Sequence, residues 1–249
     1  MVPYRLCCRP RCIPKARSPE PYSSMSPATA IQRLACPACL RPQNACICRW
    51  ARPVAHAAQV LILQHPLEVH NPKGSARLLH LSLPGSRLVT GETFADLPAL
   101  LTRPFLPDDP AAGPRQPVLL YPQAPQDMAQ GIAPGGAAPE PLALDSWRDP
   151  ARLRLVVLDG TWRKSRKMLH CNPLLLRLPR LSLKDMPASK YLVRTAHRAD
   201  QLSTLEATCA ALAQLQGGSA QFAPLLAAFD GFVARQMAYR TCQGAAGCE

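Results

Sequence analysis

Four cysteines near the start of the sequence have the spacing of a metal-binding module. Cys36 and Cys39 are separated by two residues, and Cys46 and Cys48 by one, so thirteen residues hold four thiols. Zinc prefers four thiolate ligands in a tetrahedron, and a tight turn between paired cysteines directs two sulfurs at one ion. We therefore predict a structural Zn²⁺ site, because four protein ligands leave no open position for catalysis. Four unrelated free thiols are the alternative.

A second candidate for chemistry follows the clearest strand pattern of the chain, residues 154–158. Asp159 comes directly after it, and ligands of open parallel sheets bind at the carboxyl ends of strands. A carboxylate there could act as a base or hold a cation. Gly160 would let a ligand approach the backbone, and Trp162 could stack on a ring. A helix cap at Asp159 or Thr161, with Trp162 packed in the core, is an equal alternative.

Basic residues are concentrated in two parts of the chain, whose total formal charge is +13. Residues 1–53 carry a net charge of +8 and residues 163–198 a net charge of +9, which leaves −4 for the remainder. Counterion release from phosphates would give such segments much of their affinity for nucleic acid. A solvated basic surface is the alternative. The cations beside Asp159 that we expect to contact an RNA backbone are Arg163, Lys164, Arg166 and Lys167.

The elements that would position these groups alternate between strands and helices. Strand patterns cover residues 59–65, 87–90, 117–121 and 154–158, and helical patterns begin near residues 75 and 163. Ser203 and Glu206 form a capping-box pattern before a further helix. The alternation predicts an α/β fold with a largely parallel sheet and helices on both faces.

Composition divides the chain into three parts. Residues 1–30 are expected to be a disordered basic tail, 31–53 the cysteine module, and 54–249 the main domain with a Pro/Gly/Ala-rich insertion at about 122–141. Residues 1–30 lack the apolar segment of a secretory signal, and no apolar run approaches the roughly 20 residues of a membrane span. We expect a cytoplasmic protein with reduced cysteines, no membrane association and no obligate protein partner.

Several motifs, in order along the chain, together resemble the DTW-domain family. Asp159-Gly160-Thr161-Trp162 matches the motif that names the family. The resemblance extends from the cysteine module with its Arg41-Pro42 through residues 65–68, 71–79 and 120–122 to residues 202–207. It covers about residues 36–215, and the ordered set is more specific than any one motif. The long insertion after Pro122 departs from the short Gly/Ser-containing loop that is common in the family.

The resemblance implies a tRNA-uridine aminocarboxypropyltransferase related to the SPOUT class of knotted α/β enzymes. Such an enzyme moves the 3-amino-3-carboxypropyl group of S-adenosylmethionine to N3 of a uridine in tRNA, forms acp3U and releases methylthioadenosine. Asp159 would be the catalytic residue, as a proton acceptor or as an orienting group. The expected ligand-binding residues are Tyr121, Pro122, Gly160, Thr161, Trp162, Arg194, Leu202, Ser203, Thr204 and Glu206.

The transferred group is zwitterionic and needs partners for both charges. Its carboxylate could sit on the backbone amides of Ser203 and Thr204, where a helix is expected to begin, or on the guanidinium of Arg194. Glu206 could pair with the amino group, although closing the capping box is the favoured reading.

Other residues of the matched segments would contact the ring systems and the tRNA. Tyr121 and Trp162 are candidates for stacking on adenine or uracil, with core packing the equal alternative. Lys73 and Arg77 are expected to reach tRNA, with solvent-exposed charges as the alternative.

Two other functions fit the sequence. A SPOUT-class tRNA methyltransferase would use the same co-substrate and pass on its methyl group instead. A non-catalytic zinc-knuckle protein would bind RNA and form no product. The released nucleoside distinguishes the two enzymes, since methyl transfer leaves adenosylhomocysteine.

Overall fold

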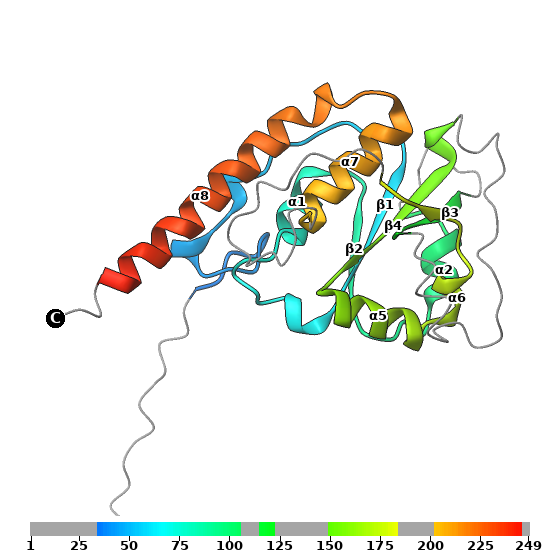
Figure 1. Ribbon diagram of the computed structural model, residues 1–249, viewed down its shortest axis with the longest axis horizontal. Coiled ribbons are helices and arrows are strands. Elements are labelled where there is room, and N and C mark those ends of the chain that lie inside the picture. The colour runs from blue at the N-terminus through cyan, green and yellow to red at the C-terminus, as the bar shows by residue number, and fades with distance from the viewer. Residues whose placement is uncertain (1–33, 106–114, 123–148, 184–201, 246–249) are drawn as a thin grey trace, which may run out of the picture. The chain divides into compact units, whose positions relative to one another are not determined.

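The structure is a computed structural model that describes residues 34–105, 115–122, 149–183 and 202–245 (Figure 1). One five-stranded sheet, in the order β2-β1-β4-β3-β5, lies at its centre, and every neighbouring pair of strands is parallel. The strands are β1 (Gln59–Gln64), β2 (Arg87–Thr90), β3 (Gln116–Leu120), β4 (Leu153–Asp159) and β5 (Arg180–Leu181). The four strands expected from the sequence are confirmed, whereas the two-residue β5 had no recognisable pattern.

The strands β1 and β4 are neighbours in the middle of the sheet. Every residue of β1 is buried, and so are six of the seven residues of β4. Such continuous burial is typical of a parallel strand covered on both faces. The edge strand β2, by contrast, has no fully buried residue.

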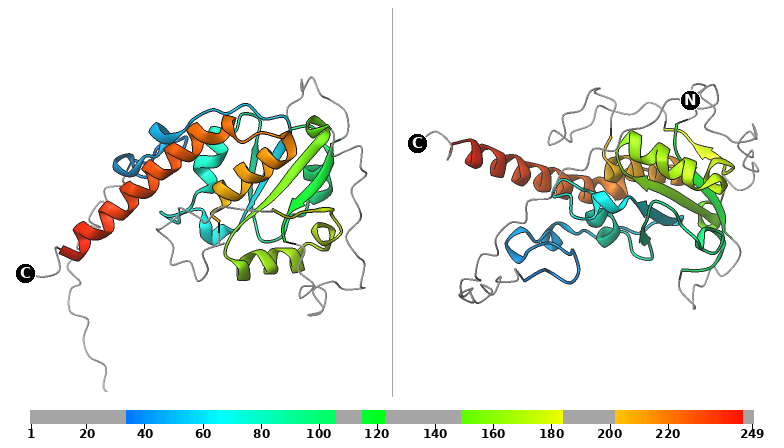
Figure 2. Two further views of the ribbon diagram at one scale, coloured as in Figure 1. Left: turned by 45° about the horizontal axis from the view of Figure 1, so that its top comes forward. Right: turned by 90° about the horizontal axis from the view of Figure 1, so that it is seen from below.

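Helices cover both faces of the sheet (Figures 1 and 2). Val60 and Ile62 of β1 point into one apolar core, and Leu61 and Leu63 point into the other. The first core is closed by α1 (Ala76–Ser82), α7 (Thr204–Gln216) and α8 (Ala223–Ala245). The second is closed by α2 (Leu97–Thr102), α5 (Trp162–Cys171) and α6 (Pro173–Leu176). The predicted α/β architecture is therefore confirmed.

The two helices beside Asp159 begin with local caps that the sequence encodes. Ser203 and Glu206 form the predicted capping box of α7, and Gly217 caps the other end of this helix in the left-handed region, with φ 71°. Thr161, rather than Asp159, is the N-cap of α5, because its side chain accepts a hydrogen bond from the Lys164 amide.

The cysteine module packs against the long helix α8. A Cβ atom on Gly231 would clash with the ring of Trp50, so only glycine lets the indole lie this close to the helix. Arg235 of α8 donates a hydrogen bond to the Asn44 carbonyl at 2.7 Å. Cys39 and Ile47 of the module belong to the same core as α7 and α8.

Several expectations concern residues outside the described ranges. They are the basic tail at 1–30, most of the insertion at 122–141, and Arg194. The connections 123–148 and 184–201 also lie outside these ranges, so the SPOUT-type knot stays a prediction. No helix in the described parts of the chain combines the length and apolar character that crossing a bilayer requires.

Candidate active site and cysteine module

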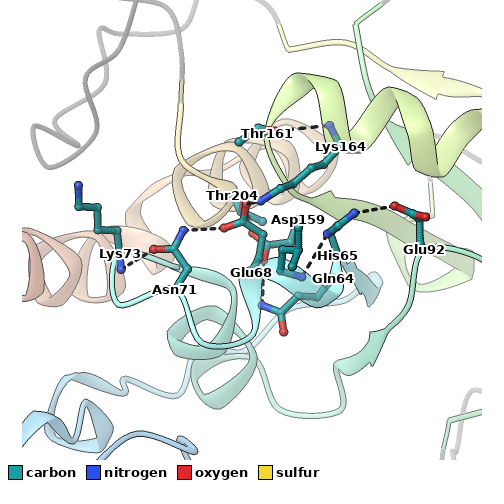
Figure 3. Close-up of polar contacts among 11 residues, drawn as sticks. Gln64, His65, Glu68, Asn71, Lys73, Glu92, Asp159, Thr161, Lys164 and Thr204 are labelled. Carbon is teal, nitrogen blue, oxygen red and sulfur yellow. Dashed lines mark hydrogen bonds and ion pairs between the residues drawn. The ribbon is translucent and has the colours of Figure 1, made fainter. Parts of the chain in front are cut away.

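Asp159 lies at the carboxyl end of β4, and two side chains hold its carboxylate (Figure 3). Gln64, directly opposite on β1, donates from Nε2 to Oδ2 at 2.9 Å, and Thr204 donates from Oγ1 to Oδ1 at 2.7 Å. Asp159 is only 3% exposed. The geometry suits a fixed, oriented negative charge.

The N-terminus of α7 brings Thr204 to Asp159, and several of its backbone groups are already bonded. The Ser203 amide donates to Glu206 Oε2 at 2.8 Å, and the Glu206 amide donates to Ser203 Oγ at 3.2 Å. The Leu205 amide donates to Ser75 Oγ at 3.3 Å. The capping role of Glu206 is confirmed. The Ser203 amide is thus engaged by Glu206, and its expected contact with a ligand carboxylate stays a prediction.

His65 follows Gln64 and is fully engaged on the other side of the site. Its Nδ1 accepts a hydrogen bond from the Leu67 amide at 3.2 Å, which places the proton on Nε2, and Nε2 lies 2.9 Å from Glu92 Oε1. Lys167 Nζ lies 2.9 Å from Glu92 Oε2. Lys167 and then His65 hold the pKa of Glu92 below its ordinary value. His65 is therefore a structural residue and has no free nitrogen for proton transfer.

Glu68 is a buried acid, 2% exposed, that ties the segment after β1 to α5. Its Oε1 lies 2.7 Å from Lys164 Nζ, and its Oε2 accepts a hydrogen bond from Asn71 Nδ2 at 2.7 Å. Asn71 Oδ1 in turn accepts from the Lys73 amide at 3.0 Å. Lys73 and Arg77 are both partly exposed, so their contact with tRNA stays a prediction.

The four cations of α5 do not form one uniform surface. Lys164 and Lys167 are paired with Glu68 and Glu92, so these two also neutralise acids of the protein itself, and contact of all four cations with RNA phosphates stays a prediction. Arg163 and Arg166 are exposed on the same helix. Sequence spacing alone gave no sign of the two acids, which come from distant segments.

Trp162 is 52% exposed, which excludes the core-packed alternative. The rings of Trp162 and Tyr121 make an edge-to-face contact, with centroids 5.5 Å apart and planes at 75°. Tyr121 itself is buried in the second core and lies under the Arg180 guanidinium, at 5.3 Å. Arg180 also donates to the Pro122 carbonyl at 3.1 Å. Of the two aromatic residues, Trp162 has the ring surface that a ligand could reach.

The remaining expected ligand residues lie around the same turn. A Cβ atom on Gly160 would lie 3.1 Å from the Cβ of Lys164, so the backbone here approaches α5 closely. Leu202 precedes the capping box of α7 and is partly exposed.

Gln64 was missed by sequence reasoning. The available signal was a polar residue that ends an apolar strand at the same edge of the sheet as Asp159.

The four cysteine sulfurs all lie within 4.8 Å of one another. The Sγ atoms of Cys36 and Cys48 are 3.6 Å apart, and those of Cys39 and Cys46 are 3.8 Å apart. Tetrahedral zinc with bonds of about 2.3 Å separates its sulfur ligands by about 3.8 Å. The residues therefore fit a Zn²⁺ ion with four thiolate ligands.

Backbone groups in the first cysteine turn favour the thiolate form of Cys36. Hydrogen bonds from the backbone of Cys39 and then Ala38 lower the pKa of Cys36 to about 6. Burial, followed by the hydrogen bond with Cys36, raises the pKa of Cys48 to about 12. Leu40 closes this turn in the left-handed region, with φ 59°. A bound cation would stabilise all four thiolates together.

A family model described as "DTW domain" matches residues 33–237. The chain belongs to the DTW-domain family. This match includes the cysteine module, the strand end at Asp159 and most of α8. No solved structure matches the chain of this family member.

Three relatives of this DTW-domain chain carry the same name. This chain is 29% identical over 195 residues to tRNA-uridine aminocarboxypropyltransferase 2 of Drosophila melanogaster, and the alignment covers 74% of this chain and 68% of the relative. The protein of the same name from Mus musculus is 29% identical over 192 residues, and that from Macaca fascicularis 28% over 193. These two alignments cover 75% of this chain and 58% of each relative, so the chain spans less than two thirds of both mammalian proteins.

Proposed function

We propose that this protein transfers the 3-amino-3-carboxypropyl group of S-adenosylmethionine to N3 of a uridine in tRNA, forming acp3U and releasing methylthioadenosine. The DTW-domain match and the names of the relatives support this activity. The observation that carries the proposal is the position of Asp159. It lies at the carboxyl end of a central parallel strand, beside the N-terminus of α7 and three residues before the exposed indole of Trp162.

The reaction is a displacement at carbon. Uridine N3 forms a bond to the carbon by which the aminocarboxypropyl group is attached to the sulfonium sulfur. The bond between this carbon and sulfur breaks, and its electron pair leaves with methylthioadenosine. The N3 proton passes to a base or to water. Because alignment of nucleophile, carbon and leaving sulfur supplies much of the acceleration in such reactions, the protein's main task is positioning.

Asp159 would supply a fixed negative charge for this alignment. Hydrogen bonds from Gln64 and Thr204 stabilise the carboxylate as an anion and fix its orientation. Because of these two hydrogen bonds, we favour a role of Asp159 in holding the ligand's ammonium or sulfonium group over a role as a proton acceptor. The Thr204 amide, the first of α7, would receive the ligand's carboxylate, and the exposed face of Trp162 would stack on a ring.

The tRNA would lie along the exposed side of α5. Arg163, Arg166 and Lys167 are exposed on this helix, and Lys167 also pairs with Glu92, whereas the partly buried Lys164 is held by Glu68. Lys73 would add a further phosphate contact from the segment before α1. A Zn²⁺ ion on the four cysteines would stabilise the module and take no part in the chemistry.

The test is incubation of the purified full-length protein with tRNA and S-adenosylmethionine, followed by mass analysis of the tRNA nucleosides and of the released nucleoside. We expect acp3U together with methylthioadenosine. A methylated uridine with adenosylhomocysteine would identify a methyltransferase instead. Salt-sensitive tRNA binding without any product would identify a non-catalytic RNA-binding protein.

A further inference from the structure

Arg41 belongs to the turn of the cysteine module and also reaches out of it. Its backbone carbonyl accepts a hydrogen bond from the Cys36 amide at 2.7 Å, which closes the first cysteine turn. Its guanidinium donates to the Pro72 carbonyl at 2.8 Å and to the Gly74 carbonyl at 3.1 Å. Arg41 therefore joins the loop that carries the expected metal ligands to a segment more than thirty positions further along the chain.

The segment that Arg41 holds, residues 71–75, leads directly to the candidate active site. It contains Lys73 and ends at Ser75, whose Oγ accepts a hydrogen bond from the Leu205 amide in the first turn of α7. The preceding residue of that helix, Thr204, donates to Asp159. A continuous path of hydrogen bonds and short chain segments thus runs from the cysteine turn to the carboxylate of Asp159.

The geometry leaves segment 71–75 little freedom to move independently of Arg41. The guanidinium is planar and binds two carbonyls as a fork, while its carbon atom lies 5.3 Å from the ring centroid of Phe232 on α8. The turn itself is tight, because a Cβ atom on Gly74 would lie 3.2 Å from the Asn71 carbonyl oxygen. Moving Arg41 would therefore move the carbonyls that it holds.

We propose that Arg41 is a positioning residue that couples metal-dependent folding of the cysteine module to the conformation of residues 71–75, and through Ser75 and Thr204 to Asp159. The coupling itself is a property of the fold. Its effect on turnover rests on the function proposed above. The cysteine module therefore acts on the site through the hydrogen bonds of Arg41 as well as by stabilising the fold.

Hydrogen exchange of the full chain tests the coupling without any activity measurement. In the zinc-loaded wild type, chelation should accelerate amide exchange in peptides covering residues 71–75 at least tenfold. Arg41→Met should exchange fast there even with zinc bound, its zinc content should equal that of the wild type, and chelation should add no further change. Arg41→Lys should recover part of the protection, because an ammonium can reach one of the two carbonyls.

Arg235 provides a matched control, because its guanidinium also donates to backbone carbonyls of the cysteine module, at Asn44 and Cys46, but comes from α8. Arg235→Met should leave exchange at residues 71–75 as in the wild type. Peptides from β1 report global unfolding. If chelation unfolds the whole chain, amide exchange at residues 71–75 in the zinc-loaded Arg41→Met and Arg235→Met proteins tests the coupling without chelation.

Two results would overturn the coupling. One is wild-type protection of residues 71–75 in zinc-loaded Arg41→Met. The other, when peptides from β1 show that the chelated chain stays folded, is an equal effect of chelation on this segment in the wild type and in Arg41→Met. Turnover is measured in parallel and should fall at least tenfold in Arg41→Met but not in Arg235→Met. If the wild type itself forms no acp3U, the proposed function fails, while the exchange data still decide the coupling.

Discussion

Gln64 and Asp159 lie opposite each other at the carboxyl ends of β1 and β4, and the Gln64 amide donates to Asp159 Oδ2 at 2.9 Å. The orientation of the amide is fixed, because the reverse orientation would place two acceptor oxygens together. Both residues are buried. The negative charge of the site is thus held by an adjacent strand and, through Thr204, by α7.

Asp159→Asn should lower turnover by at least about 100-fold, because it removes the charge and retains the shape of the side chain. Affinity for tRNA, measured by filter binding, should stay within about twofold of the wild type. Thr204→Val should also lower turnover, since it removes one donor to Asp159, whereas Thr204→Ser should retain most of it. Full activity of Asp159→Asn would exclude the proposed role of this carboxylate.

The cysteine module should contain about one Zn²⁺ per chain. Cys39→Ser should bring the zinc content well below one and lower the thermal unfolding temperature, because a structural zinc site contributes directly to folding free energy. Cys171→Ser is the control, since Cys171 lies outside the cluster and should leave both quantities unchanged. Elemental analysis with calorimetry measures them. A zinc content that does not respond to Cys39→Ser would contradict the assigned ligand set.

Arg163→Glu combined with Arg166→Glu should weaken tRNA binding. The slope of log K against log salt concentration should become shallower by about 1 for each phosphate that the protein no longer neutralises. Thermal stability should change little, because both side chains are exposed. Lys164→Met should instead lower stability, since it removes the cation paired with the buried Glu68 carboxylate. Binding that is insensitive to the double substitution would remove α5 from the RNA interface.

Arg154→Met should reduce the free energy of unfolding by about 3 kcal/mol, measured by urea denaturation. Arg154 has no solvent exposure, and its guanidinium donates to Gln59 Oε1 and to the Leu100 and Arg103 carbonyls. Substitution would take this donor away from all three acceptors, of which those of Gln59 and Leu100 are in buried hydrogen bonds. Arg87→Met is the control, because Arg87 lies over the same Phe105 ring but is exposed, and it should cost less than about 0.5 kcal/mol.

The features predicted correctly from the sequence are those with a local cause. The capping box at Ser203 and Glu206 is confined to four residues, and its pattern identified the start of α7. The apolar runs of β1 and β4 identified the central strands because burial on both faces requires unbroken apolar sequence. The group of four thiols that could hold a metal ion was predictable because thirteen residues contain all four cysteines.

The partners of the site residues could not be predicted in this way. Gln64 and Asp159 are 95 positions apart, and Lys164 and Glu68 are 96 apart, so only the order of strands in the sheet brings them together. The basic cluster on α5 therefore suggested four cations facing RNA, although two of them neutralise acids of the protein itself. Arg154 was equally hidden, because a charged residue within an apolar strand gives no sign of its partners.

The packing of Trp50 against Gly231 has a consequence for the order in which the chain folds. The cysteine module is synthesised early, but the surface that covers Trp50 is a helix made about 180 residues later. During translation the indole of Trp50 therefore stays uncovered until α8 leaves the ribosome. Nascent chains shorter than residue 231 should therefore be the species most dependent on chaperones.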